Sequence, residues 1–228
     1  MDDAQADRPP LNLREKAYAS FTRHLLARDI RAGQFISQRE LVELTGLPLG
    51  AIRELVPRLE AEGLVKTVPQ RGMQVAHVDL ALIKDAFQYR LFLEREAVAV
   101  FTAEASAAVI GRLRAAHDEV LARLEAALAA DALTPELLAE AQALDWDLHA
   151  TIIDALGNRI ISDAYRVNAI KIRLIRQEQT LLNDAVVLAT MQEHLEIIAG
   201  IEKRDPATAA EAMAAHIVSA RKRATGMG

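Results

Sequence analysis

Cysteine is absent from this chain of 228 residues. Its absence excludes disulfides and thiolate metal sites and suits a reducing cytoplasm. Glycine and proline are scarce, with 10 and 7 copies, and aromatic residues make up only 4% of the chain. No apolar run reaches the roughly 18 residues that a membrane-spanning helix needs. The first ten residues, MDDAQADRPP, also lack the apolar stretch of a secretory signal. We therefore expect a cytoplasmic protein without a membrane partner.

Alanine and leucine are abundant, and the chain is 51% hydrophobic and 26% charged. This composition allows a sizeable core and favours helix over strand. The net charge of −5 is unevenly spread: residues 11–78 carry 10 basic and 7 acidic side chains, whereas residues 79–228 carry 16 and 22. The basic N-terminal third is consistent with an anionic partner. Ordinary variation in composition is the alternative.

The N-terminal third has the pattern of a helix-turn-helix. Apolar residues four apart predict a helix within residues 11–28. The letters SQRE fit a capping box at the start of a second helix, over about 38–45. After Gly46 a third helix begins near Pro48 and ends near Gly63. Two short helices joined by a tight glycine-containing turn are typical of this DNA-binding motif.

After the third helix the apolar period changes from that of a helix to that of strands. The runs LVKTV and GMQVAHV, separated by PQRG, predict a two-stranded hairpin, or wing. The third helix would then enter the major groove of DNA, with Arg53 on its outer face. Arg39 could contact phosphate, and Arg71 at the hairpin tip could reach the backbone or the minor groove. Taken singly, each arginine is better explained as a solvated surface charge, but together on one predicted surface they favour DNA.

Beyond residue 78 only helix signals remain. We predict six helices over about 145 residues, joined by short loops and packed as an antiparallel bundle. Cap residues mark helix starts at Asp79, Ser106, Thr134 before Pro135, and Asp205 before Pro206. Gly157–Asn158 separates two of the helices, and Asp184 opens another. The predicted fold is thus mostly α, with a winged helix-turn-helix over 11–78 and an all-helical bundle of six or seven helices over 79–225.

The stretch QALDWDLHATII places Asp145 and His149 on one apolar helical stripe, close enough to bind one ion. His194 and His216 also lie near apolar stripes of other helices. Together these four side chains predict a site for a divalent ion such as Zn, Ni, Mn or Fe. A metal-free hydrogen-bond network is the alternative. His117 has charged neighbours, and we expect it on the surface.

The run RAGQFISQRELVELTGLPLGAIRELVPRLEAEGLVKTVPQRGMQVA resembles the winged helix-turn-helix of the GntR superfamily of bacterial transcription regulators. The resemblance implies operator contacts by Arg39, Arg53 and the wing tip, Arg71 with Gly72. The chain departs from the family at Pro48 and Leu49, where a polar residue and a base-reading arginine are usual. Leu49 could instead contact a thymine methyl group.

A second departure is Pro57, inside the predicted recognition helix. Proline removes one helical hydrogen bond and costs about 3 kcal/mol in a regular helix. We therefore predict a kink or a tightened turn over residues 53–57.

Residues 80–222 resemble the all-helical FCD-type domain that follows the winged helix in one GntR branch. The resemblance maps the metal quartet of that domain onto Asp145, His149, His194 and His216. It also implies a homodimer, a pseudo-palindromic double-stranded operator, and a small carboxylate or sugar-acid effector. Arg90 and Asn158 are the candidate effector-binding residues. A surface ion pair with Glu94 is the alternative for Arg90.

We therefore expect a ligand-responsive transcription regulator rather than an enzyme. Two other functions fit the same quartet: a metalloenzyme, whose open metal positions would activate water, and a regulator that senses the metal itself. Glu193 and Glu196, beside His194, are better explained as solvated residues than as a general base.

Overall fold

The computed structural model describes residues 12–179 and 184–226. Residues 1–11, whose acidic character argued against a secretory signal, lie outside this part of the chain. The chain divides into one compact unit that ends at Leu82 and a second that begins at Ile83.

The first unit begins with three helices: α1 (Leu13–Leu26), α2 (Gln38–Thr45) and α3 (Leu49–Ala61). Capping boxes start two of them, because Asn12 and Ser37 each accept a hydrogen bond from a backbone N–H three residues later. Gly46 ends α2 in the left-handed conformation, with φ of 69°. The predicted helix-turn-helix is therefore present.

Apolar side chains from all three helices form the core of the first unit. Ala17, Phe21 and Leu25 of α1 are fully buried, as are Ile52 and Leu59 of α3. The apolar spacing of α1 predicts this stripe correctly, except that Leu13 at the start of the helix is 56% exposed.

Helix α3 runs without interruption through Pro57. Since proline has no N–H, the Arg53 carbonyl lacks its usual helical partner. Pro57 is exposed, so water can bind that carbonyl in place of the missing donor. The proline therefore does not end the helix, and a local bend at residues 53–57 stays a prediction.

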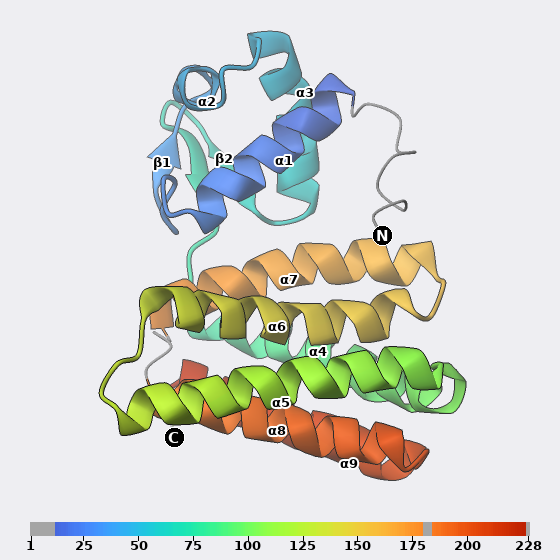
Figure 1. The fold of residues 1–228 in the computed structure, drawn as a ribbon. Helices are drawn as coiled ribbons and strands as arrows, with labels where there is room; N and C mark the ends of the chain where they lie inside the picture. The colour runs from blue at the N-terminus through green and yellow to red at the C-terminus, as the bar shows by residue number, and fades with distance from the viewer. Residues whose placement is uncertain (1–11, 180–183, 227–228) are drawn as a thin grey trace. The chain divides into compact units, whose positions relative to one another are not determined.

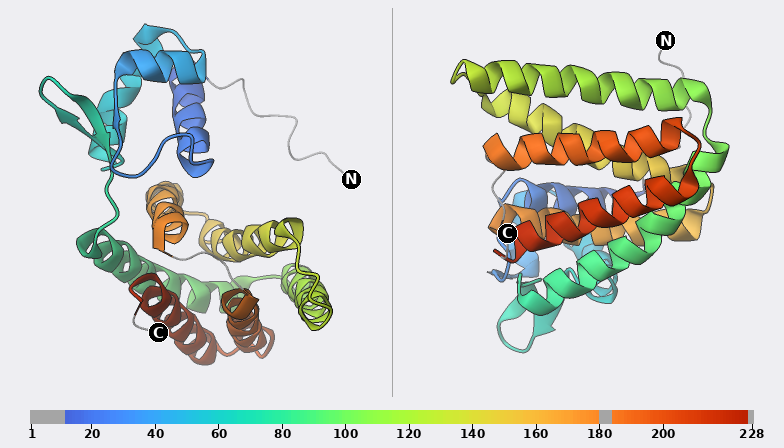
Figure 2. Two further views of the ribbon diagram at one scale, coloured as in Figure 1. Left: turned by 90° about the vertical axis from the view of Figure 1, so that its left-hand side faces the viewer. Right: turned by 90° about the horizontal axis from the view of Figure 1, so that it is seen from below.

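The wing is part of a small antiparallel sheet with strand order β1-β3-β2. The strands are β1 (Phe35–Ile36), β2 (Val65–Val68) and β3 (Gly72–Val75). The hairpin of β2 and β3 matches the sequence prediction, and the two-residue β1 adds a strand that the sequence pattern did not indicate. The left view of Figure 2 shows the hairpin extending from the helices of this unit.

The second unit consists, in its described residues, of six helices that lie side by side (Figure 1). They are α4 (Leu80–Glu104), α5 (Ala107–Ala129), α6 (Pro135–Asp154), α7 (Arg159–Gln179), α8 (Asp184–Glu202) and α9 (Pro206–Ala224). As predicted, Asp79, Ser106, Thr134 and Asp205 each accept backbone N–H hydrogen bonds at a helix start. Asn158 also caps a helix, α7, a cap that the sequence did not predict.

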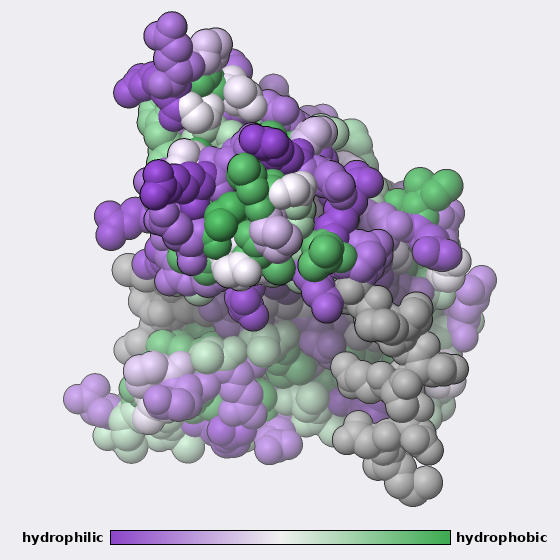
Figure 3. Space-filling model, turned by 90° about the horizontal axis from the view of Figure 1, so that it is seen from above, coloured by the Kyte–Doolittle hydropathy of each residue, from purple (hydrophilic) through white to green (hydrophobic). Residues whose placement is uncertain are grey.

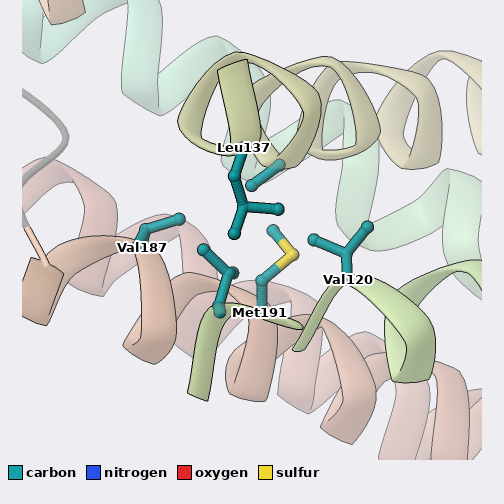
Figure 4. Packing of buried hydrophobic residues seen from close by; sticks show 6 residues of the cluster. Val120, Leu137, Val187 and Met191 are labelled. Carbon is teal, nitrogen blue, oxygen red and sulfur yellow. The ribbon is translucent and has the colours of Figure 1, made fainter. Parts of the chain in front are cut away.

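Helices α5, α6 and α8 share an apolar core (Figure 4). Its buried members are Val120 and Leu124 of α5, Leu137 and Ala141 of α6, and Val187 and Met191 of α8. Among the described helices, none is long and apolar enough to cross a membrane.

Helices α8 and α9 approach each other closely at Gly200. A Cβ atom added at this glycine would lie 2.8 Å from the backbone nitrogen of Ala209. This close approach sets the spacing of the two helices that carry His194 and His216.

Candidate metal centre and nucleic-acid interface

The four predicted ligands converge inside the second unit. Asp145 and His149 lie one turn apart on α6, His194 lies on α8 and His216 lies on α9. Each offers one ligand atom, and these atoms all lie within 4.8 Å of one another. All four residues are at most 2% exposed. Three segments far apart in the sequence therefore place one carboxylate and three imidazoles around a common centre.

Two of the three histidines have a carboxylate beside the ring nitrogen Nδ1. The His149 Nδ1 lies 2.6 Å from Oε2 of Glu94, a residue of α4. The His216 Nδ1 lies 2.8 Å from Oε2 of Glu193, on α8. In metal sites such partners hold the ring so that Nε2 faces the ion. The arrangement leaves Nε2 of His216 to face a metal, whereas Nε2 of His149 lies 3.0 Å from Nη2 of Arg90.

Arginines lie against the same polar cluster. Arg90 donates to Glu94 through Nε at 2.6 Å, and its Nη2 lies 3.0 Å from Nε2 of His149. Arg176 of α7 donates to Oδ2 of Asp145. Guanidinium groups thus contact two of the four candidate ligands and balance the buried carboxylates.

The carboxylates of the cluster are ionised. Burial alone would raise the pKa of Glu94, but the Arg90 guanidinium outweighs burial and holds this pKa well below its usual range. Burial also acts against ionised Asp145. The Arg176 guanidinium outweighs that effect, so the pKa of Asp145 is likewise low.

Two of the histidines are neutral. Burial lowers the pKa of His194 to about 3. Burial also lowers the pKa of His216 to about 4, although the hydrogen bond to Glu193 acts in the opposite direction. For His149, burial lowers the pKa but the charge of Glu94 raises it, and the net shift is upward. Neutral imidazole is the form that binds a metal.

The residues fit a divalent metal ion. Both ring nitrogens of His194 are buried and have no hydrogen-bond partner among the described residues, while Nε2 lies 3.2 Å from Oδ1 of Asp145. A buried nitrogen without a partner is costly, and a metal bound at Nε2 would remove that cost. Imidazole nitrogens with one carboxylate suit Zn, Ni, Mn or Fe.

A cavity of about 20 Å³ lies beside the cluster, which is room for about one water-sized group. It is lined by Phe87, Arg90, Arg176, Val186, Thr190, His216, Ala220 and Arg223. Three of these eight residues are arginines, so a group bound here would meet cationic donors.

The structure corrects two expectations about this region. His117 is fully buried instead of lying on the surface, because it falls on the inner face of α5 with Leu113 and Val120. Glu193 is also not simply solvated, since it bonds His216 and accepts two hydrogen bonds of 2.9 Å from Arg223. Glu196 is exposed, as expected.

The two candidate effector residues have different surroundings. Arg90 forms the ion pair with Glu94 that was the alternative to an effector role, but the pair is buried and touches the quartet. Asn158 is exposed and caps α7 by accepting hydrogen bonds from the N–H groups of Ile160 and Ile161. It is not among the residues that line the cavity described above.

Several residues of the site have no local sequence signal. Arg176, Glu193 and Arg223 contact partners 23 to 31 residues away in the sequence. Helical spacing could have indicated two residues of α7, because Arg173 and Arg176 are one turn apart and both contact Trp146. Their guanidinium carbons lie 4.9 and 4.8 Å from the Trp146 ring centroid.

The candidate DNA-contacting residues lie at the surface of the first unit. Arg39 at the start of α2 has an 89% exposed side chain, and Arg53 on α3 is exposed as well. Leu49, the first residue of α3, is 40% exposed. Figure 3 looks onto the side of this unit that carries α2 and α3, where hydrophilic side chains surround a smaller apolar patch.

The wing tip is held in place by packing. The Arg71 guanidinium lies over the ring of Phe35, 4.2 Å from its centroid. Gly72 has a φ of 87°, and a Cβ there would lie 3.0 Å from the Ile36 carbonyl oxygen. Any other residue would be strained here, so glycine suits the close contact between β1 and β3.

The fold and the site define a class of protein: a winged DNA-binding domain joined to a helical domain with a buried polar centre. Two family models match. The model for bacterial regulatory proteins of the gntR family matches residues 13–75, and the FCD domain model matches residues 85–219. The chain belongs to the GntR family of transcription regulators, in the branch that carries an FCD ligand-binding domain. As predicted, these are regulators and not enzymes.

Relatives support the same assignment. The chain is 27% identical over 211 residues to the HTH-type transcriptional repressor GlaR of Escherichia coli K12, with 85% of this chain and 90% of GlaR covered. It is 32% identical over 101 residues to an uncharacterized HTH-type transcriptional regulator of Streptomyces ambofaciens. That match spans 44% of this chain and 43% of the Streptomyces protein.

Solved structures share the fold. The E. coli protein McbR/YncC matches with a TM-score of 0.74 at 14% identity, covering 95% of this chain and 99% of its own. A putative GntR regulator of Rhodococcus sp. RHA1 matches with a TM-score of 0.70 at 16% identity, covering 93% and 98%. At these identities the likeness concerns the fold alone.

Proposed function

We propose that this protein is a metal-dependent regulator that binds a pseudo-palindromic operator as a homodimer and responds to a small carboxylate or sugar acid. The observation that carries the proposal is the convergence of Asp145, His149, His194 and His216 within 4.8 Å inside the FCD domain. A DNA-binding regulator acts where the chromosome lies, so we place it in the cytoplasm. The name of the E. coli relative supports repression as the mode of action.

The metal would be held by the Asp145 carboxylate and the three imidazoles. An ion with up to six coordination positions keeps two of them for other ligands, and as a Lewis acid it can bind a carboxylate oxygen of the effector. The low pKa values of His194 and His216 support this assignment, because protons do not compete for their nitrogens at neutral pH.

The effector would be an anion because arginines line the cavity beside the quartet. Arg90, Arg176 and Arg223 each carry fixed positive charge, and a guanidinium can bind a carboxylate through two parallel hydrogen bonds. Each now bonds a carboxylate of the protein. An effector carboxylate would replace one of these partners. The resulting shift in helix packing would alter operator affinity, provided the effector binds one arrangement more tightly. Asn158 stays a proposed effector residue, although it does not line this cavity.

A direct metal sensor is the second candidate. The cavity of about 20 Å³ favours it, since an organic acid cannot enter without movement of side chains. In that case the ion alone would change operator binding.

Operator contact would come from the first unit. Arg53 and Leu49 on α3 would meet base edges in the major groove, and Arg39 with the wing tip, Arg71 and Gly72, would contact the backbone. The exposure of the three arginines supports these roles.

The homodimer would use the exposed side of α4. Tyr89, Phe92 and Val100 form an apolar stripe there, and Phe92 is 67% exposed. A groove between α4 and α9 continues this surface and includes Arg95 and Glu96, charges of both signs. A two-fold interface must be self-complementary, which such a mixed surface allows. Phe92→Asp should shift the protein from dimer to monomer in light scattering, whereas an unchanged mass would exclude this surface.

The deciding experiment is operator binding by protein purified without chelator. Its metal content is measured, and the protein is then titrated with duplex DNA in the presence of EDTA, of Zn²⁺, and of Zn²⁺ with acetate, succinate or gluconate. A change in affinity that needs both Zn²⁺ and an acid supports the carboxylate regulator. A change with Zn²⁺ alone supports the metal sensor, and a protein that binds no metal in any form refutes both.

A further inference from the structure

The three candidate ligand histidines differ in the groups that lie next to their Nδ1 atoms. Carboxylate oxygens of Glu94 and Glu193 lie 2.6 and 2.8 Å from Nδ1 of His149 and His216. Nδ1 of His194 has no hydrogen-bond partner among the described residues. We propose that His117 is the positioning residue for His194, accepting a hydrogen bond from its Nδ1–H and so turning its Nε2 towards the metal. The proposal rests on the metal centre of the proposed function and adds a fourth histidine, outside the ligand set.

The tautomer of His117 follows from its contact with the backbone. Its Nδ1 lies 2.7 Å from the carbonyl oxygen of Leu113. A carbonyl oxygen only accepts, so Nδ1 carries the hydrogen. His117 is fully buried on α5, where a neutral ring is favoured. Nε2 is therefore a lone-pair acceptor, and it is buried without a partner among the described residues.

The tautomer of His194 follows from its place in the quartet. Its Nε2 lies 3.2 Å from Oδ1 of Asp145, at the common centre of the four ligands. A nitrogen that binds a metal must offer its lone pair, so in the metal-bound form Nδ1 carries the hydrogen. This Nδ1 is also buried and has no partner among the described residues. It is a donor that needs an acceptor.

The unpaired donor and the unpaired acceptor lie on adjacent rings. The centroids of His117 and His194 are 5.4 Å apart, with an angle of 71° between the ring planes. The helices that carry them, α5 and α8, pack directly against each other. A small rotation of one ring or a single bridging water would join the two nitrogens. The result is a chain from the Leu113 carbonyl through both rings to the metal, which satisfies both orphaned groups.

The test uses the full-length protein and Co²⁺ as the probe, because its visible absorption reports the ligand geometry. His117→Leu removes the acceptor at similar volume, and His117→Gln keeps an acceptor near the position of Nε2. Competition with a chelator should show Co²⁺ affinity lowered by about tenfold to a hundredfold in H117L, the range for loss of an outer hydrogen-bond partner. H117Q should stay within a few-fold of the parent, and circular dichroism should show both variants folded.

The outcomes separate this proposal from the metal centre itself. A parent that binds no Co²⁺ refutes the centre and the proposal together. A parent that binds, with H117L binding equally well or H117Q losing as much as H117L, refutes only the role of His117. If H117L does not fold, ¹⁵N NMR of the Zn²⁺-loaded parent decides: hydrogen on Nδ1 of both rings is the expected result, and hydrogen on Nε2 of His117 overturns the proposal.

Discussion

The guanidinium of Arg90 lies 3.0 Å from Nε2 of His149, the nitrogen that the quartet offers to a metal. This nitrogen has one lone pair, so it cannot bind a metal and accept a hydrogen bond from Arg90 at the same time. Binding of the ion therefore requires Arg90 to turn away, towards Glu94 or towards an incoming anion. Metal binding at His149 would therefore change the position of Arg90, the residue proposed to bind the effector.

Removal of the Arg90 charge should destabilise the metal-free protein. In Arg90→Met the buried Glu94 loses its cationic partner, and breaking a buried pair in this way costs about 3–5 kcal/mol. Zn²⁺ brings positive charge back to the cluster, so we expect a smaller loss in the metal-loaded form. Urea unfolding of parent and variant, with EDTA and with Zn²⁺, measures the difference. Equal losses in both conditions would show that Arg90 and the metal do not act on the same charges.

Loss of the Asp145 carboxylate should abolish tight metal binding. Asp145 and Asp147 lie two residues apart on α6, but the first is buried in the quartet and the second is exposed. Asp145→Asn should therefore lose most of the bound metal in elemental analysis of the purified protein, and Asp147→Asn should retain it. Similar metal contents in the two variants would place the ion elsewhere.

Arg53→Ala should weaken operator binding. Loss of a base-contacting arginine costs about 1–3 kcal/mol and relaxes specificity at one position. Anisotropy titration with a labelled operator duplex at fixed salt measures the effect. Arg123→Ala, which removes an exposed arginine of the second unit, is the matched control. An Arg53 variant that footprints the operator as the parent does would exclude a contact by this side chain.

The fluorescence of Trp146 should report occupation of the centre. It is the only tryptophan of the chain, and it contacts Arg176, which also bonds Asp145. A metal bound to Asp145 would weaken the bond between this carboxylate and Arg176, so the emission of Trp146 should change on addition of Zn²⁺ and recover with EDTA. The Asp145→Asn variant should show no Zn²⁺-dependent change in emission. A response as large as that of the parent would show that the change does not arise from metal binding at the quartet.

Local sequence signals predicted the helices well because caps and apolar periodicity act within a few residues. Ser37, Thr134 and Asp205 start helices through bonds to N–H groups two or three residues away. The same reasoning failed for His117, whose immediate neighbours are charged. Its partners at helical spacing, Leu113, Val120 and Leu124, place it on the buried face. The relevant neighbours on a helix are three and four residues away.

The sequence by itself determined which residues could bind a metal and which segments form the winged helix-turn-helix, since both depend on residue type and short spacing. Tertiary packing alone decided that His194 and His216 lie next to Asp145 and His149. This requires the close approach of α8 and α9 at Gly200 and Ala209. Tertiary packing also decided the partners of the ligands, such as Glu193 for His216 and Arg176 for Asp145. Those contacts join residues 23 and 31 positions apart, and their energy depends on burial that no local pattern encodes.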